Sequence, residues 1–404
     1  MEDSFATWPK SGGMHRFPSF SLEERDRRWG RVRELMAVRK IDCLLAPGMR
    51  AAEDHANARY LSQMGSPYGA PWVIFPLTGE VTAVLGTSRD IKQWSKLTNW
   101  IGDLRYGEGS DLAVERLKEL RIDSGIVGVT DLSGSYRNPG GVFPHEHFRK
   151  LQQALPGTKF APDNEVLELA RMVKGKEEVE VIEKITQANE RAIEKMFEVA
   201  RPGVELARVW LAVTTTMIEM TGDYPARVSI AADSDANSTI GLPIPEPIQE
   251  GALLSQELCA RLQGYRAQSN HSFVVGRKRS DDYDRAMNVA IDIYHALVDW
   301  VRPGRTVGAL VDEYERLAKQ KGASVSSVMV HTNGLGNDRP RVGPGVREKD
   351  RPLVIEPGFT FTMKPAPKMI DSGFFAQVGD PVTVSEKGAR RLGRRKLQPV
   401  VVGD

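Results

Sequence analysis

Residues 174–203 read KGKEEVEVIEKITQANERAIEKMFEVARPG. Apolar residues recur at helical spacing among the charges, which predicts one long helix. Arg201-Pro202-Gly203 ends it, because proline cannot continue a helix and glycine favours the turn that closes one. A second helix, Asp281 to Val301, stops at the same tripeptide, Arg302-Pro303-Gly304, and each stop precedes another helical stretch. These matching stops predict that this half of the chain is internally duplicated.

The second half also contains segments with the composition of strands. The pattern of the chain changes around Pro162–Glu165, so we place a domain boundary near residue 165, between residues 1–165 and 166–404. With strands between and after its helices, the second domain is predicted to be α+β. The predicted strand segments are Ala252–Leu262, Tyr265–Gly276, Val325–Val330, Phe359–Lys364 and Phe374–Val384.

The first domain has the pattern of an α/β fold. A helix is predicted from Glu23 to Arg39, followed by a buried strand from Ile41 to Ala46. No glycine-rich phosphate loop follows any predicted strand. The remaining segments are a charged helix at Ala113–Leu120 and strands at Trp72–Pro76, Val81–Leu85 and Ile126–Val129.

Composition narrows the class of partner. The 404 residues include 55 basic and 53 acidic ones, so no global field attracts nucleic acid or an anionic membrane. The basic run Arg390–Lys396 has no interleaved aromatic residues and does not predict nucleic-acid binding. The first 20 residues lack the apolar core of a secretory signal, and no segment has membrane-spanning length. Because Cys43 and Cys259 are the only cysteines, we expect a reducing compartment, the cytoplasm.

Five short motifs occur in the order and spacing of a known family. None is specific alone, but together the chain resembles the pita-bread family of creatinase and aminopeptidase P over nearly its whole length. The resemblance implies an α/β N-terminal domain, an α+β pita-bread catalytic domain and a homodimer. The motifs are Arg171-Met172-Val173-Lys174, Gly264-Tyr265, Asn333-Gly334-Leu335-Gly336, Glu356-Pro357-Gly358-Phe359-Thr360 and Asp380-Pro381-Val382-Thr383-Val384.

The resemblance also implies where metals would bind. Metal-dependent members use two aspartates, a histidine and two glutamates, and the matching positions here are Glu257, Gln268, Asn333, Lys364 and Gly379. Divalent cations need several anionic oxygens or imidazoles. One carboxylate beside a lysine, two amides and a glycine cannot supply these ligands. We therefore expect no metal, no other cofactor and no metallopeptidase mechanism.

Creatinase is a metal-free member, but the chain departs from it as well. The stretch that holds the creatinase base matches Asn237-Ser238-Thr239-Ile240, which has no histidine, and Asn270 replaces a carboxylate that binds guanidinium. Creatine is therefore not the expected substrate. By resemblance, Arg341 keeps an arginine of the creatinase site, and Tyr68 of one subunit would cover the site of its partner.

Within the predicted strand segment Tyr265–Gly276, alternation separates site residues from structural ones. Alternate strand residues share a face. If Gln268 points into the cavity, as the resemblance implies, then Arg266 and Asn270 do as well, while His271 points away into the structure. Lys364 has two interpretations that the sequence leaves open. It could fill the space of the missing cations by pairing with Glu257, or it could be a base whose pKa is lowered by nearby cations.

Two further residues are candidates for acid or base. His331 precedes the conserved turn and Asp338 follows it. The cations near these positions, Arg266, Arg339, Arg341 and Lys364, predict a cavity that favours a carboxylate or a developing oxyanion, unless they only form a salt-bridge network with Glu257 and Asp338.

The sequence thus predicts a metal-independent enzyme acting on a small, anionic molecule, by acid-base lyase or C–N hydrolase chemistry. We expect Tyr68, Arg266, Gln268, Asn270, Asn333 and Arg341 to bind the substrate. Two alternatives stay open, a catalytically inert pita-bread scaffold and a peptidase with an unorthodox metal site.

Overall fold

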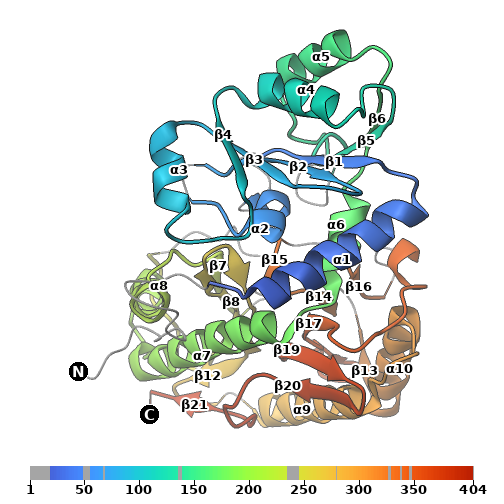
Figure 1. The fold of residues 1–404 in the computed structure, drawn as a ribbon. Helices are drawn as coiled ribbons and strands as arrows, with labels where there is room; N and C mark the ends of the chain where they lie inside the picture. The colour runs from blue at the N-terminus through green and yellow to red at the C-terminus, as the bar shows by residue number, and fades with distance from the viewer. Residues whose placement is uncertain are drawn as a thin grey trace. The chain divides into compact units, whose positions relative to one another are not determined.

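The structure is a computed structural model that describes residues 19–48, 55–66, 69–134, 139–233, 245–278, 280–325, 329–336, 339–344 and 348–403 (Figure 1). The chain forms two compact units. The first contains the described residues from 19 to 171 together with Leu335 and Gly336, and the second contains Met172–Gly334 and the residues from Arg339 onward.

The first unit is built on a six-stranded sheet in the order β4-β3-β2-β1-β5-β6. Its central strand β1 is fully buried and pairs antiparallel with β2 and parallel with β5, so the sheet is mixed. Strands β2 and β5 have the bounds that the sequence predicts. The strands are β1 (Cys43–Ala46), β2 (Trp72–Pro76), β3 (Thr82–Leu85), β4 (Asp103–Tyr106), β5 (Ile126–Val129) and β6 (Lys159–Pro162). The helices are α1 (Leu22–Val38), α2 (Ala56–Ser62), α3 (Ser88–Trp94), α4 (Gly109–Glu119), α5 (His145–Ala154) and α6 (Glu165–Met172).

The second unit combines two helix pairs with two larger sheets (Figure 1). No helix in the described ranges is apolar over enough length to cross a membrane. The helices are α7 (Lys176–Val199), α8 (Leu206–Thr221), α9 (Asp282–Trp300) and α10 (Val307–Gln320), with a short 3-10 turn η3 (Glu348–Asp350).

One sheet of the second unit has the order β21-β12-β8-β7, and the other has the order β11-β19-β17-β14-β16 with β20 added beside β19. The strands are β7 (Arg227–Ala232), β8 (Ala252–Cys259), β9 (Arg261–Leu262), β10 (Tyr265–Arg266), β11 (Asn270–His271), β12 (Phe273–Val275), β13 (Ala323–Ser324), β14 (Val330–Thr332), β15 (Gly334–Leu335), β16 (Arg341–Val342), β17 (Thr360–Met363), β18 (Lys368–Met369), β19 (Val378–Ser385), β20 (Gly388–Arg391) and β21 (Val401–Val402).

The duplication predicted from the helix stops is present in the backbone hydrogen bonds. Gly203 and Gly304 both have positive φ, +82° and +86°, which glycine adopts without steric cost. The N–H of Gly203 donates to the carbonyl of Ile248 at 2.8 Å, and that of Gly304 donates to Ile355 at 2.9 Å. The two helix pairs thus contain the same turn, and in each the turn is bonded to a loop segment about 45 to 51 residues later.

The third predicted strand of the second unit and the last one are shorter than the sequence indicates. Of Val325–Val330, only Val330 lies in a described strand, and residues 326–328 are outside the described ranges. The segment Phe374–Gln377 precedes the ladder of β19, which starts at Val378. Only an isolated bridge between Phe375 and Lys368 occurs there. Gln377 therefore lies at the entrance of a strand rather than within it.

The basic run near the C-terminus turns partly inward. Asp380 on β19 is fully buried, and it accepts from Arg391 Nε at 2.7 Å and from Arg395 Nη1 at 2.5 Å. Arg395 also donates through Nη2 to the carbonyl of Asn270 at 2.7 Å. Arg395 thus bridges strands β11 and β19, while Arg391 binds Asp380 on β19.

Candidate functional site

The candidate site is built around Glu257 on β8. Its carboxylate is 2% exposed and pairs with the ammonium of Lys364, which is 6% exposed. Arg227 on β7 approaches the other oxygen, with 3.1 Å between its Nε and Oε2 of Glu257. Burial disfavours the charged carboxyl, but Lys364 and Arg227 outweigh burial and lower the pKa of Glu257 to about 2. The pairing of Lys364 with Glu257, which the sequence left open, is present.

Strand register explains why these three side chains meet. Glu257 stands opposite Ser229 in the β7–β8 pair, and Arg227 stands opposite Cys259, so Arg227 is a diagonal neighbour of Glu257. Lys364 directly follows β17, and its N–H donates to the carbonyl of Met329 at 2.9 Å. Sequence reasoning missed Arg227, because no local signal marks a diagonal contact between strands about 30 residues apart.

His331 on β14 is a buried, neutral imidazole beside this ion pair. A carbonyl can only accept, so the 3.1 Å contact between His331 Nδ1 and the Thr332 carbonyl assigns the proton to Nδ1. The acceptor nitrogen is then Nε2. Burial, together with the charges of Lys364 and Arg341, lowers the pKa of His331 to about 3. Arg341 lies directly opposite His331 in the β14–β16 pair.

Asn333 and Thr362 extend the polar cluster. Thr362 lies two residues before Lys364, and its Oγ1 is 2.8 Å from Oδ1 of Asn333. Asn333 is buried, and its Nδ2 has no hydrogen-bond partner among the residues that the structure describes. Because a buried, unsatisfied amide costs free energy, this position is suited to a water molecule or a ligand.

A chain of amides continues from the hairpin. Gln268 Nε2 donates to Oδ1 of Asn270 at 3.1 Å, and Asn270 Nδ2 donates to Oε1 of Gln377 at 3.0 Å. All three side chains are buried. Gln268 was predicted from the family resemblance and Asn270 from alternation, whereas Gln377 was not predicted. Its signal in the sequence was its position two residues before Gly379, a ligand position implied by resemblance.

His271 faces away from this chain, as the alternation predicts. Its Nε2 donates to the carbonyl of Gln398 at 2.9 Å, and its ring packs edge-on against Phe197 at 5.6 Å between centroids. Burial and the charge of Arg395 lower its pKa to about 3. The role of His271 is therefore structural.

The cluster of cationic side chains at the site is smaller than the one predicted from the sequence. Arg339 is bonded through Nε to the buried carboxylate of Asp350 at 2.6 Å, which also accepts from the N–H of Arg341 at 3.1 Å. Arg339 is thus occupied in a structural pair. Arg266 is half-buried on β10 and contributes to the electrostatic field at Cys259. Three predictions fall outside the described residues, namely Tyr68, Asp338 and the stretch 237–240.

Gly379 is too close to its neighbours for any side chain. A Cβ added there would lie 2.6 Å from Cβ of Lys364 and 2.9 Å from the carbonyl oxygen of Met363. A glutamate ligand therefore does not fit at this position without a backbone shift. Over the described parts of the chain, no group of three or more His, Cys, Asp or Glu side chains is placed to hold a metal ion. The donor set at the five positions does not fit a divalent cation.

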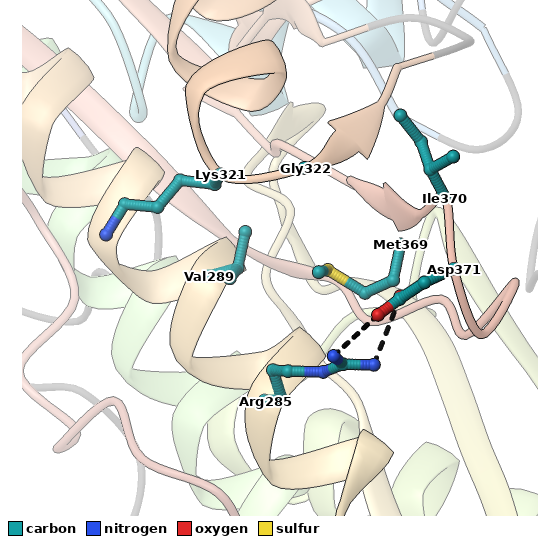
Figure 2. Close-up of a pocket in the computed structure, with 7 residues that line it drawn as sticks. All are labelled: Arg285, Val289, Lys321, Gly322, Met369, Ile370 and Asp371. Atoms are coloured by element: carbon teal, nitrogen blue, oxygen red, sulfur yellow. Dashed lines mark hydrogen bonds and ion pairs between the residues drawn. The ribbon is translucent and has the colours of Figure 1, made fainter.

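A separate surface pocket of about 420 Å³ opens beside α9, α10 and β18 (Figure 2). Arg285 and Asp371 form a two-pronged ion pair across it, with distances of 2.7 and 3.1 Å. None of the predicted site residues lines this pocket. Its lining consists of Arg285, Val289, Lys321, Gly322, Met369, Ile370 and Asp371.

The buried histidines predict a dependence of stability on pH. In the unfolded chain the imidazole pKa is 6.5, whereas it is about 3 at His271 and His331 in the folded protein. Below pH 6.5 the unfolded state therefore binds protons that the folded state does not, and stability falls as pH falls from 6.5 toward 3. At pH 5 each histidine lowers the free energy of unfolding by about 2 kcal/mol.

Urea denaturation at pH 7.5, 6.5 and 5 measures this effect before most carboxylates titrate. The variant His271→Gln should lose about half of the pH dependence, because glutamine keeps a donor for Gln398 and has no titrating group. An unfolding free energy that stays constant from pH 7.5 to 5 would contradict the neutral, buried state of both residues.

Comparisons with known proteins agree with this architecture. The model of metallopeptidase family M24 matches residues 180–386. A Xaa-Pro dipeptidase from Pyrococcus furiosus is 23% identical over 78% of this chain and 90% of its own length. A creatinase from Bacillus sp. strain B-0618 is 22% identical over 96% of this chain and 95% of its own. The solved structure of a Xaa-Pro dipeptidase from Bacillus anthracis superposes with a TM-score of 0.77 at 18% identity, over 94% of this chain and all of that one.

Proposed function

Since the chain belongs to metallopeptidase family M24 and has the pita-bread fold, we propose that it is a metal-independent hydrolase acting on a small carboxylate-bearing molecule. The observation that carries this proposal is the neutral imidazole of His331 beside an ionised Glu257 and the cations that surround it. Groups with pKa values separated in this way are typical of acid-base sites.

The donor set supports the proposed independence from metals. The ammonium of Lys364 stands at one ligand position and pairs with the carboxylate at another, so the charge that a metal would supply is provided by a side chain. Gly379 leaves no room for a further ligand. A bound divalent cation would have to displace the buried ammonium from Glu257, at a large cost in desolvated charge.

The surrounding charges support the proposed binding of an anion. Lys364, Arg227 and Arg341 act electrostatically on Glu257 or on His331. A substrate carboxylate placed among these cations would offset the positive field of Lys364 and Arg341 that lowers the pKa of His331. Substrate binding therefore makes His331 a stronger base than it is in the free protein.

The chemistry that fits these groups is hydrolysis of a C–N bond. His331 Nε2 takes a proton from water, the hydroxide adds to the carbonyl carbon, and Lys364 and Arg341 stabilise the oxyanion. The C–N bond then breaks, and the amine leaves with the proton returned by His331. The same base could instead remove a C–H proton, which keeps a lyase as the second candidate. Hydrolysis is favoured because the dipeptidase and the creatinase in the comparisons are both named for hydrolysis of C–N bonds.

The test is a screen of N-acyl amino acids, guanidino acids and other small carboxylates for turnover, before and after treatment with a chelator. Elemental analysis of the same preparation measures bound zinc, manganese and iron. We expect turnover that the chelator does not change. Stoichiometric metal with activity lost on chelation would overturn the proposal, and a protein without affinity for any small carboxylate would favour the scaffold.

We infer also that the enzyme acts as a homodimer in the cytoplasm. The family resemblance supports the dimer, and the two free, buried thiols of Cys43 and Cys259 suit a reducing compartment. We propose no nucleic-acid or membrane partner. Light scattering measures the mass in solution, and a monomer at micromolar concentration would contradict the dimer.

A further inference from the structure

The amide chain of Gln268, Asn270 and Gln377 has a fixed direction. Asn270 Nδ2 donates to the backbone carbonyl of Gln256 at 2.6 Å as well as to Gln377. A carbonyl can only accept, so the amide of Asn270 cannot be turned over without placing two oxygens against each other. Its Nδ2 therefore faces Gln377, whose oxygen must face Asn270 in turn.

Gln377 is held in place at its backbone too. Its N–H donates to Oγ of Ser272 at 3.0 Å, and its carbonyl accepts from the N–H of Ser272 at 2.9 Å. The side chain is 1% exposed, and its Nε2 has no hydrogen-bond partner among the described residues. A well-anchored amide thus ends in a buried donor whose orientation is set by its neighbours.

The amide chain of Gln268, Asn270 and Gln377 adjoins the cationic part of the site at both of its ends. At one end, Sγ of Cys259 contacts Oε1 of Gln268 at 3.5 Å, and Cys259 lies within the electrostatic reach of Glu257, Arg227 and Lys364. At the other end, Gln377 precedes Gly379 by two residues, and Gly379 packs directly against Lys364. Residues two apart on extended chain share a face, so the amide of Gln377 belongs to the face of the site.

We propose that Nε2 of Gln377 donates a hydrogen bond to an oxygen of the substrate and thereby selects the substrate class. This inference rests on the proposed function, which places the substrate carboxylate among the cations Lys364, Arg227 and Arg341. The substrate then carries a second acceptor, a carbonyl or carboxylate oxygen, beyond its first carboxylate.

The same donor, Nε2 of Gln377, excludes a second class of substrate. An ammonium or guanidinium group placed against Gln377 would bring donor against donor and leave both groups unsatisfied. Sites built to bond one kind of polar group reject analogues that lack it much more strongly than they reject analogues that differ in size. Guanidino and free amino groups at this end of the substrate are therefore disfavoured.

The experiment compares ligands that differ only at the second group. The probes are glutarate, pentanoate and 5-aminopentanoate, with the corresponding sets of four and six carbons, and calorimetry at pH 7.5 measures Kd. The variants are Gln377→Met, which removes the amide at similar volume, and Gln377→Glu, which keeps the acceptor for Asn270 and replaces the donor by an oxygen. A third variant, Lys364→Met with Glu257→Gln, removes the buried ion pair.

We expect the wild type to bind the best dicarboxylate roughly 10-fold more tightly than the monocarboxylate of equal length. Gln377→Met should lower this ratio by roughly 10-fold and leave monocarboxylate binding unchanged. Gln377→Glu should shift the preference toward the amino acid. The third variant should lose monocarboxylate binding.

The two proposals fail separately. A dicarboxylate preference that stays the same in Gln377→Met and Gln377→Glu overturns the role of Gln377 alone. Monocarboxylate binding that persists in the third variant overturns the anion site and therefore the proposed function. A wild-type protein that binds none of the probes overturns both.

Discussion

Replacing Lys364 with methionine is expected to destabilise the protein by about 3–5 kcal/mol, because it removes one partner of a buried ion pair. Glu257 is 2% exposed, and its remaining partner, Arg227, is about one third exposed. If Lys364 were only a catalytic base, this substitution would remove activity and leave the fold intact. The burial of the pair changes that expectation, because the loss of activity would be accompanied by a loss of stability.

The double variant Lys364→Met with Glu257→Gln removes both charges. It should recover most of the lost stability, since a neutral amide is far less costly to bury. A matched control is Lys321→Met, because Lys321 pairs with Asp292 while both are about half exposed. Exposed pairs contribute at most about 1 kcal/mol. Urea denaturation at pH 7.5 measures all three variants. Equal losses in Lys364→Met and Lys321→Met would contradict the assignment of a buried ion pair.

Replacing Gly379 with alanine is expected to cost about 3 kcal/mol, although it adds a single methyl group. The new Cβ would lie 2.6 Å from Cβ of Lys364 and 2.9 Å from the Met363 carbonyl, and backbone cannot move aside as a flexible side chain can. Thermal and urea unfolding measure the loss. Gly379→Glu, which restores the carboxylate of the metal-dependent relatives, should be at least as destabilising.

Gly30→Ala is the matched control for Gly379→Ala. Gly30 lies within helix α1, and a Cβ there meets nothing within 4 Å. Alanine in the middle of a helix is favoured over glycine, so this substitution should stabilise by about 0.5–1 kcal/mol. If Gly379→Ala were as stable as the wild type, the packing between β17 and β19 would leave room for a ligand side chain. Steric exclusion at position 379 would then no longer speak against a bound metal.

Both predictions concern positions that, by the family resemblance, correspond to metal ligands. The carboxylate of Glu257 remains at its position, but its counter-charge comes from Lys364 and Arg227 instead of a cation from solution. Such a centre is assembled when the chain folds. Under the proposed function its charge does not depend on metal supply, whereas its integrity depends on the stability of β8, β17 and their neighbours.

The candidate site was predicted from sequence in part. The family resemblance identified Glu257, Gln268, Asn333 and Lys364, and alternation on the hairpin added Asn270. Arg227 and Gln377 were missed. Arg227 reaches Glu257 diagonally across two strands, and Gln377 is positioned by Ser272, more than 100 residues earlier in the chain. Contacts of this kind depend on strand register, which no local pattern specifies.

By itself the sequence determined the local structure and the family, and it predicted the loss of the metal ligands. Short-range chemistry accounts for the helix stop at Arg201-Pro202-Gly203, for its repeat and for buried strands such as Trp72–Pro76. The residue types at the five motif positions can be read directly from the sequence. Only the tertiary structure decided which charges pair, that His331 is held neutral, that Arg339 is committed to Asp350, and that Gly379 has no space beside it. These properties depend on distance and burial among segments that are far apart in the chain, and both are set only when the sheets pack.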